Sequence, residues 1–124
     1  MKTAKCLILL AVLLPLAGCR KDDAYDIRGD WSFHHDNVTY DFLRFVGSRE
    51  SGTVEQVGSD ALHGTYTVTG KDVAFNYEYR LDYLSWSCSF VGAFDSDDVM
   101  TGTMDFLAPF QPYNWSEEVV GERL

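Results

Sequence analysis

Histidines and a run of aspartates are the residues of this chain best suited to holding a metal ion. His34 and His35 are adjacent and precede Asp36, while His63 lies in a later segment. Neighbouring residues of a strand point to opposite faces, so we expect His34 and His35 not to share an ion. The acidic run at residues 95–98 lacks the Gly and terminal Glu of an EF-hand loop. We interpret these residues as exposed strand ends and a polar turn, and expect no metal and no cofactor.

Cys88 is the thiol most naturally placed within a folded domain. It shares its predicted strand face with Trp86 and Phe90, and no cationic residue lies near it in the sequence. Burial among apolar groups raises a thiol's pKa, so a core cysteine is favoured over a nucleophile. The sequence contains no serine-hydrolase elbow, phosphate loop or zinc motif. We therefore expect no catalytic residues and no enzymatic activity.

The N-terminal segment has the three parts of an export signal. Lys2 and Lys5 precede an apolar run of about a dozen residues, shorter than the roughly 20 that an α-helix needs to span a bilayer. The run ends in Leu16, Ala17, Gly18 and Cys19, which resemble the lipobox of bacterial lipoproteins. The resemblance implies cleavage of residues 1–18 as a signal peptide and acylation of the Cys19 thiol. An ordinary secretory signal with an incidental Cys19 is the alternative.

Acylation at Cys19 implies a membrane partner. Two or three fatty-acyl chains such as palmitate hold a protein stably on a membrane, whereas one chain holds it only marginally. Arg20 stands where Asp retains some Gram-negative lipoproteins in the inner membrane, so we expect the outer membrane of the cell envelope. Residues 20–23 also resemble short surface-export tags, and a charged linker is the alternative. We assign residues 19–27 to a lipidated tether and residues 28–124 to one domain.

The charge balance restricts the partners of this domain. The full chain has 10 basic and 19 acidic residues, and removing residues 1–18 takes away Lys2 and Lys5, so the mature net charge is −11. Such a surface repels nucleic-acid phosphates, and we expect no nucleic-acid partner. It favours solubility and basic partners.

The remaining pattern is that of an all-β domain. Residues 72–79 alternate, with Val73, Phe75, Tyr77 and Tyr79 on one face. Short alternating runs recur about every ten residues between Gly, Asp and Ser clusters, and Gly70 begins a two-residue hairpin turn. We predict eight antiparallel strands closed into an up-and-down barrel, with a two-sheet sandwich as the alternative. The predicted strands cover residues 30–35, 38–46, 52–57, 64–69, 72–79, 85–94, 99–107 and 115–124.

The first and last predicted strands resemble those of the lipocalin and calycin barrels. Gly29 and Trp31 form the Gly-x-Trp of their first strand, and Arg123 matches the basic residue of their last strand. The resemblance implies that Arg123 stacks on Trp31 and closes the barrel base. Residues 27–124 are most similar to the compact lipocalin-like or avidin-like domains of bacterial exported proteins. The chain lacks the length, the helix and the disulfide of true lipocalins.

The interior and the mouth of the barrel determine what it can bind. Eight strands enclose either a filled centre or a space for one small ligand. The bulky predicted inward residues favour a filled centre, with a shallow cup at the open end as the alternative. Phe110, Tyr113 and Trp115 lie in a Pro-rich segment, where they either fold over the mouth or form a contact patch.

Two functions follow as hypotheses. The first is a membrane-anchored, non-enzymatic binding module of lipocalin-like type for a small hydrophobic ligand or surface partner. The second is an acidic inhibitor or interaction protein for a basic exported enzyme such as a lysozyme or a protease.

Overall fold

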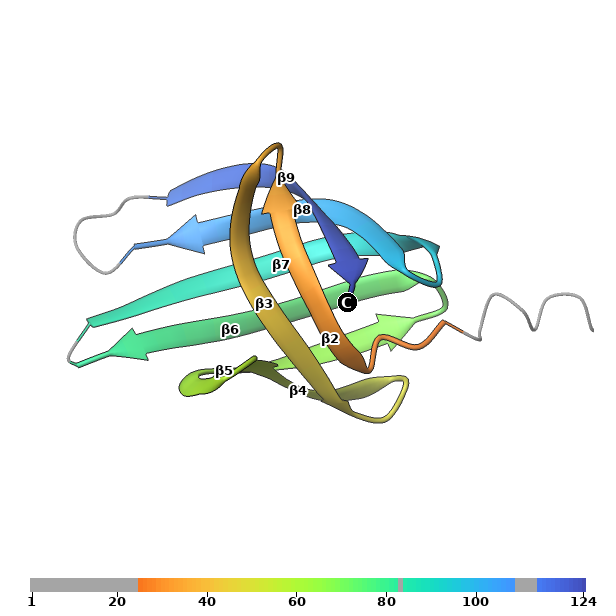
Figure 1. Cartoon of the computed structure of the whole chain (residues 1–124), viewed down its shortest axis with the longest axis horizontal. Coiled ribbons are helices and arrows are strands. Elements are labelled where there is room, and N and C mark those ends of the chain that lie inside the picture. The colour runs from red at the N-terminus through yellow and green to blue at the C-terminus, as the bar shows by residue number, and fades with distance from the viewer. Residues whose placement is uncertain (1–24, 83, 109–113) are drawn as a thin grey trace, which may run out of the picture.

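The structure is a closed barrel of eight antiparallel strands, each hydrogen-bonded to its neighbours in sequence (Figure 1). It is a computed structural model that describes residues 25–82, 84–108 and 114–124. It confirms the predicted all-β, up-and-down architecture; the expected signal peptide lies outside the described residues. The strands are β2 (Gly29–His35), β3 (Val38–Gly47), β4 (Ser51–Gln56), β5 (Ser59–Thr69), β6 (Asp72–Leu81), β7 (Leu84–Ser96), β8 (Val99–Leu107) and β9 (Asn114–Arg123).

Sequence alternation places the side chains of β6 as expected. Val73, Phe75 and Tyr77 are buried, while the residues between them are exposed. Gly70 begins the turn that joins β5 to β6 and has a φ of 62°. That left-handed conformation is accessible to Gly at little cost, which explains the tight turn.

Aromatic side chains fill one half of the barrel. Phe75 stacks on Phe90 with ring centroids 4.8 Å apart, and Phe33 meets both rings edge-on at 5.3 and 5.7 Å. Phe45 adds another edge contact to Phe75 at 5.2 Å. Offset and edge-to-face pairs of this kind are the favoured arrangements of aromatic rings. This half is therefore a packed core, as the bulky inward residues predict.

The Phe90 ring lies over two glycines that face each other across β7 and β8. Gly92 pairs with Gly102, and a Cβ built on either residue would come within 2.7 Å of the Phe90 ring. The backbone of the opposite strand is closer still, so no side chain fits at either position. The missing side chains make the space that this ring occupies.

The base of the barrel is closed by Arg123, whose backbone pairs with that of Trp31 between β9 and β2. Its guanidinium lies 4.5 Å from the centroid of the Trp31 ring. Arg123 also donates hydrogen bonds to the carbonyl oxygens of Asp26, Arg28 and Asp97 and to the Asp98 carboxylate. The stacking implied by the lipocalin resemblance is thus present. Through it, Arg123 links the N-terminal segment, the β7–β8 turn and the first strand.

The end of the expected tether packs against this base. Ile27 is fully buried, and its carbonyl oxygen accepts a hydrogen bond of 2.7 Å from the Trp31 indole. Tyr25 stacks on Phe94 with ring centroids 4.8 Å apart. Tyr25 and Ile27 lie outside any periodic run of the sequence, so their packing could not be predicted from it. The packed structure therefore includes residues 25–27, which were expected to belong to the tether.

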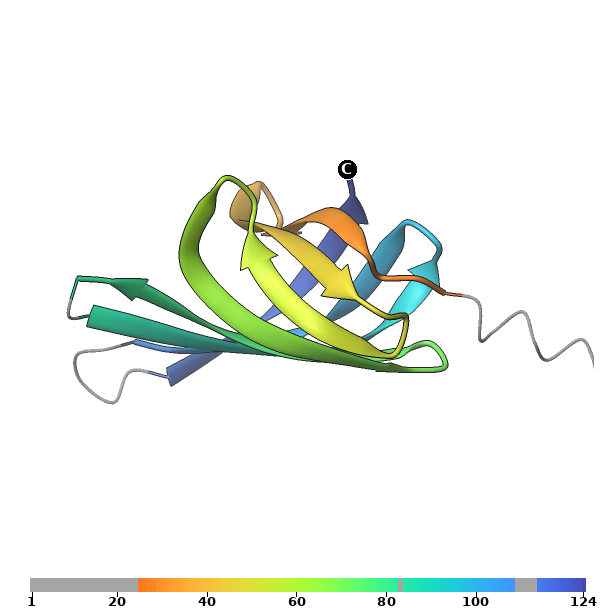
Figure 2. The ribbon, with the colours of Figure 1, turned by 90° about the horizontal axis from the view of Figure 1, so that it is seen from below.

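The two ends of the barrel differ. Strands β6, β7, β8 and β9 extend beyond β2–β5 at the end where β6 and β8 finish and where β7 and β9 begin (Figure 2). The coloured segment that leads into β2 lies on the opposite side of the barrel (Figure 1). The structure thus has a base, closed by Arg123, and an open mouth.

We predict that Arg123→Met lowers the free energy of unfolding by about 2–3 kcal/mol, because the charge-assisted hydrogen bonds and the cation–π contact are lost while most of the apolar stem remains. Urea denaturation measures this. Arg80→Met is the matched control, since Arg80 pairs with Glu78 at an exposed site and its loss should change stability by less than about 0.5 kcal/mol. Equal effects of the two substitutions would refute the assigned role of Arg123.

Candidate functional site: a cup at the open end

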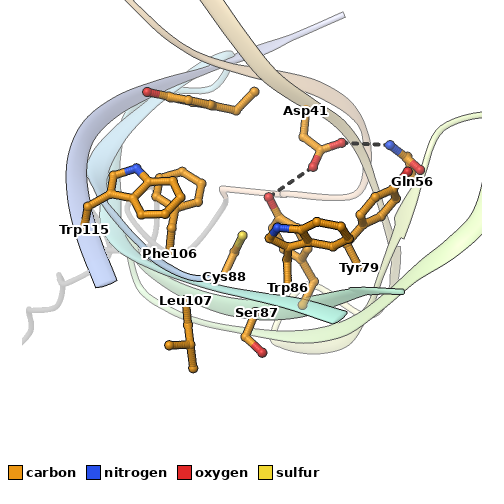
Figure 3. Close-up of a pocket in the computed structure, with 11 residues that line it drawn as sticks. Asp41, Gln56, Tyr79, Trp86, Ser87, Cys88, Phe106, Leu107 and Trp115 are labelled. Carbon is orange, nitrogen blue, oxygen red and sulfur yellow. Dashed lines mark hydrogen bonds between the residues drawn. The ribbon is translucent and has the colours of Figure 1, made fainter. Parts of the chain in front are cut away.

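A cup of about 370 Å³ occupies the open half of the barrel. This volume lies within the range of about 300–1,000 Å³ typical of small-molecule sites. Residues of strands β3, β4 and β6–β9 form its walls (Figure 3). It is lined by Tyr40, Asp41, Gln56, Tyr77, Tyr79, Trp86, Ser87, Cys88, Phe106, Leu107 and Trp115.

A β-bulge brings two residues of β3 to the cup. Phe33 of β2 pairs with Asp41, and the next residue, His34, pairs with Thr39, so Tyr40 has no partner across the ladder. An extra residue of this kind bends the strand and redirects its side chains. Tyr40 and Asp41, although adjacent, consequently both line the cup.

The Asp41 carboxylate is held in place by two neutral donors (Figure 3). The Tyr77 hydroxyl and the Gln56 side-chain amide each donate a hydrogen bond of 3.1 Å, one to each carboxylate oxygen. Burial raises the pKa of the Asp41 carboxyl, and the hydrogen bonds from Tyr77, Gln56 and the Phe42 backbone offset only part of this effect. Asp41 is thus a fixed, partly desolvated acid.

Aromatic pairs form the cup's walls. Trp86 contacts Tyr79 with ring centroids 5.8 Å apart, and Phe106 stacks on Trp115 at 5.0 Å. Tyr40 leans on Phe106 from the facing strand, at 5.2 Å. Figure 3 shows the Trp86–Tyr79 and Phe106–Trp115 pairs on different sides of the cup, with Cys88 between them. Some of the bulky inward side chains predicted from the sequence therefore fill the packed half of the barrel, and the others form the walls of the cup.

Cys88 is buried and free. Burial raises the pKa of its thiol to about 11, against the opposing effect of its hydrogen bond with Tyr77. A thiol of this pKa holds very little thiolate near neutral pH, so Cys88 is a poor nucleophile. The Tyr77 hydroxyl is raised in pKa by its own burial. These groups line the cup as neutral polar atoms.

Of the residues expected at the mouth, Trp115 lies at the start of β9 and forms part of the cup wall. Phe110 and Tyr113 lie outside the described residues, as do the lipobox residues Leu16, Ala17, Gly18 and Cys19.

The histidines have separate partners. His34 Nε2 lies 3.1 Å from a Glu122 carboxylate oxygen, while His35 Nδ1 lies 2.6 Å from the Glu118 carbonyl oxygen. Within residues 25–82, 84–108 and 114–124, no group of three or more His, Cys, Asp or Glu residues is placed to hold a metal ion.

Sequence reasoning did not identify Asp41 or Gln56. One signal was present: Asp41 shares the inward parity of Leu43 and Phe45, and a carboxylate on such an apolar face requires a partner. The Gln56 position has no such signal, since a register shift of β4 against β5 sets its direction.

Comparisons with protein-family models, with curated proteins and with solved structures find no match for this chain. In the described part of the chain, no helix is long and apolar enough to cross a membrane. The geometry of the cup is therefore the guide to function.

We predict that the stability of Asp41→Asn relative to the wild type is higher at about pH 8 than at about pH 4. The folded-state pKa of Asp41 lies above its unfolded value, so the wild type loses stability as pH rises through this interval, and Asn removes that loss. Thermal unfolding of both proteins across this range measures the difference in Tm. A difference in Tm between the two proteins that stays constant at all pH values would contradict the raised pKa of Asp41.

Proposed function

We propose that this protein is a non-enzymatic binding module of lipocalin-like type, which holds a small, largely apolar ligand in its cup. The cup is the observation that carries the proposal: a concave site of about 370 Å³, walled by aromatic rings, with a few convergent polar groups. Sites of this composition bind small molecules, with apolar contact supplying affinity and polar groups supplying orientation.

We further propose that the chain is made as a lipoprotein precursor and anchored through acylated Cys19 in the cell envelope, at the outer membrane of a Gram-negative bacterium. The lipobox-like residues 16–19 support this. The described chain begins at the barrel base, away from the mouth. An anchor only a few residues before Tyr25 would therefore hold the base near the lipid and leave the cup facing away from the membrane.

The neutral dye N-phenyl-1-naphthylamine tests the binding function. We expect saturable binding of one dye per barrel, with altered emission from Trp86 and Trp115. Phe106→Ser should weaken binding about tenfold, because one apolar wall of the cup is lost.

Val91→Ser is the control for this experiment. Val91 is an outward residue of β7 with 68% of its surface exposed, and its replacement should leave dye affinity unchanged. Absence of saturable binding, or equal weakening by both substitutions, would refute binding in the cup.

The anchor is tested separately by labelling cells with radioactive palmitate. Cys19→Ser should abolish the label. It should also either block processing or release the processed domain from the membrane fraction, because no acyl chain remains to hold it. Cys88→Ser should keep both label and location. A correctly cleaved Cys19→Ser protein that stays tightly membrane-bound would overturn the anchor proposal.

A further inference from the structure

The cup contains an acid without a counter-ion. Its lining includes Asp41 but no Lys, Arg or His. None of the ion pairs formed among residues 25–82, 84–108 and 114–124 involves Asp41. Burying a carboxylate away from water is costly unless an opposite charge or sufficient hydrogen bonds compensate. The fold leaves that compensation incomplete.

The existing partners of Asp41 leave it able to accept further bonds. Tyr77 and Gln56 are neutral, and each engages one carboxylate oxygen. The Phe42 backbone N–H adds a third hydrogen bond to this carboxylate. An ionised carboxylate has about four acceptor sites, so at least one of them remains free. Both donors orient the carboxylate while leaving its charge unneutralised. A cation entering the cup would complete the pair.

The walls suit a cation as well. The π faces of Trp and Tyr rings attract ammonium groups, and this attraction strengthens when the cation is desolvated. Trp86 with Tyr79, and Trp115 with Phe106, present such rings around the cup. Clusters of aromatic rings are a recognised arrangement for binding quaternary ammonium ions, and the Asp41 carboxylate adds an opposite charge to them.

We propose that the ligand of the cup is an organic cation, an amine or quaternary ammonium with a compact apolar body. The ammonium group lies against Asp41 and the aromatic rings, and the apolar body contacts the remaining wall. This inference rests on the proposed binding function and specifies its ligand class. It also gives Asp41 a role: its charge is destabilising in the empty barrel and useful in the occupied one.

Three probes of equal chain length test the proposal: octyltrimethylammonium, 1-octanol and octanoate. Their affinities are measured by isothermal titration calorimetry at about pH 8. This pH favours the ionised form of a carboxyl group whose pKa is raised above the usual range. We expect the cation to bind tightest and octanoate weakest. Asp41→Asn should weaken binding of the cation by about tenfold or more and leave 1-octanol unchanged.

Asp72→Asn is the matched control, because it removes one negative charge from an exposed position at the start of β6 and should not alter any affinity. Trp86→Leu should weaken the binding of octyltrimethylammonium more than the binding of 1-octanol. Equal binding of cation and alcohol, unaffected by Asp41→Asn, would overturn the cation proposal and leave the binding function standing. Tightest binding by octanoate would also overturn it, and failure of all three probes would count against both proposals.

Discussion

The stacking of Arg123 on Trp31 is the contact on which the rest of the barrel depends. Only four residue pairs join β9 to β2, so the seam between first and last strands is short. Arg123 reinforces it with hydrogen bonds to three backbone carbonyls and to Asp98, drawing in the N-terminal segment and the β7–β8 turn. With the base closed, the aromatic core stays packed, and the opposite end can remain open without loosening the whole.

The open end has a cost that the closed end offsets. Burial in the cup disfavours the ionised form of Asp41, and its neutral donors compensate only in part. Ionisation of Asp41 near neutral pH therefore reduces the stability of the fold. The packed half of the barrel, with Phe33, Phe75 and Phe90 in mutual contact, tolerates this loss. Strain or desolvation concentrated at one place and supported elsewhere is typical of binding sites.

Much of the fold was predictable because several strands alternate clearly. Val73, Phe75 and Tyr77 mark an inward face of β6 without ambiguity, and less regular runs separated by turn residues delimit the other strands. The cup was less predictable, since several of its residues occur where alternation breaks. Asp41 keeps the inward parity of Leu43 and Phe45, but a bulge turns Tyr40 toward the same space, and a sequence pattern of period two cannot represent that local insertion. The burial of Ile27 could not be predicted for a related reason, because Ile27 joins a core cluster whose other members come from distant strands.

The hydrogen bond from Arg123 to the Arg28 carbonyl joins residues 95 positions apart in the chain. Contacts of such separation form late in folding, because the loop between them must first lose its conformational freedom. Every other strand pair is a neighbour in sequence and can form locally. A nascent chain can therefore assemble a curled sheet from β2 to β8 while both sheet edges stay unpaired. Those edges stay open to association with other chains until β9 is available, so the pairing of β9 determines when the barrel is protected from aggregation.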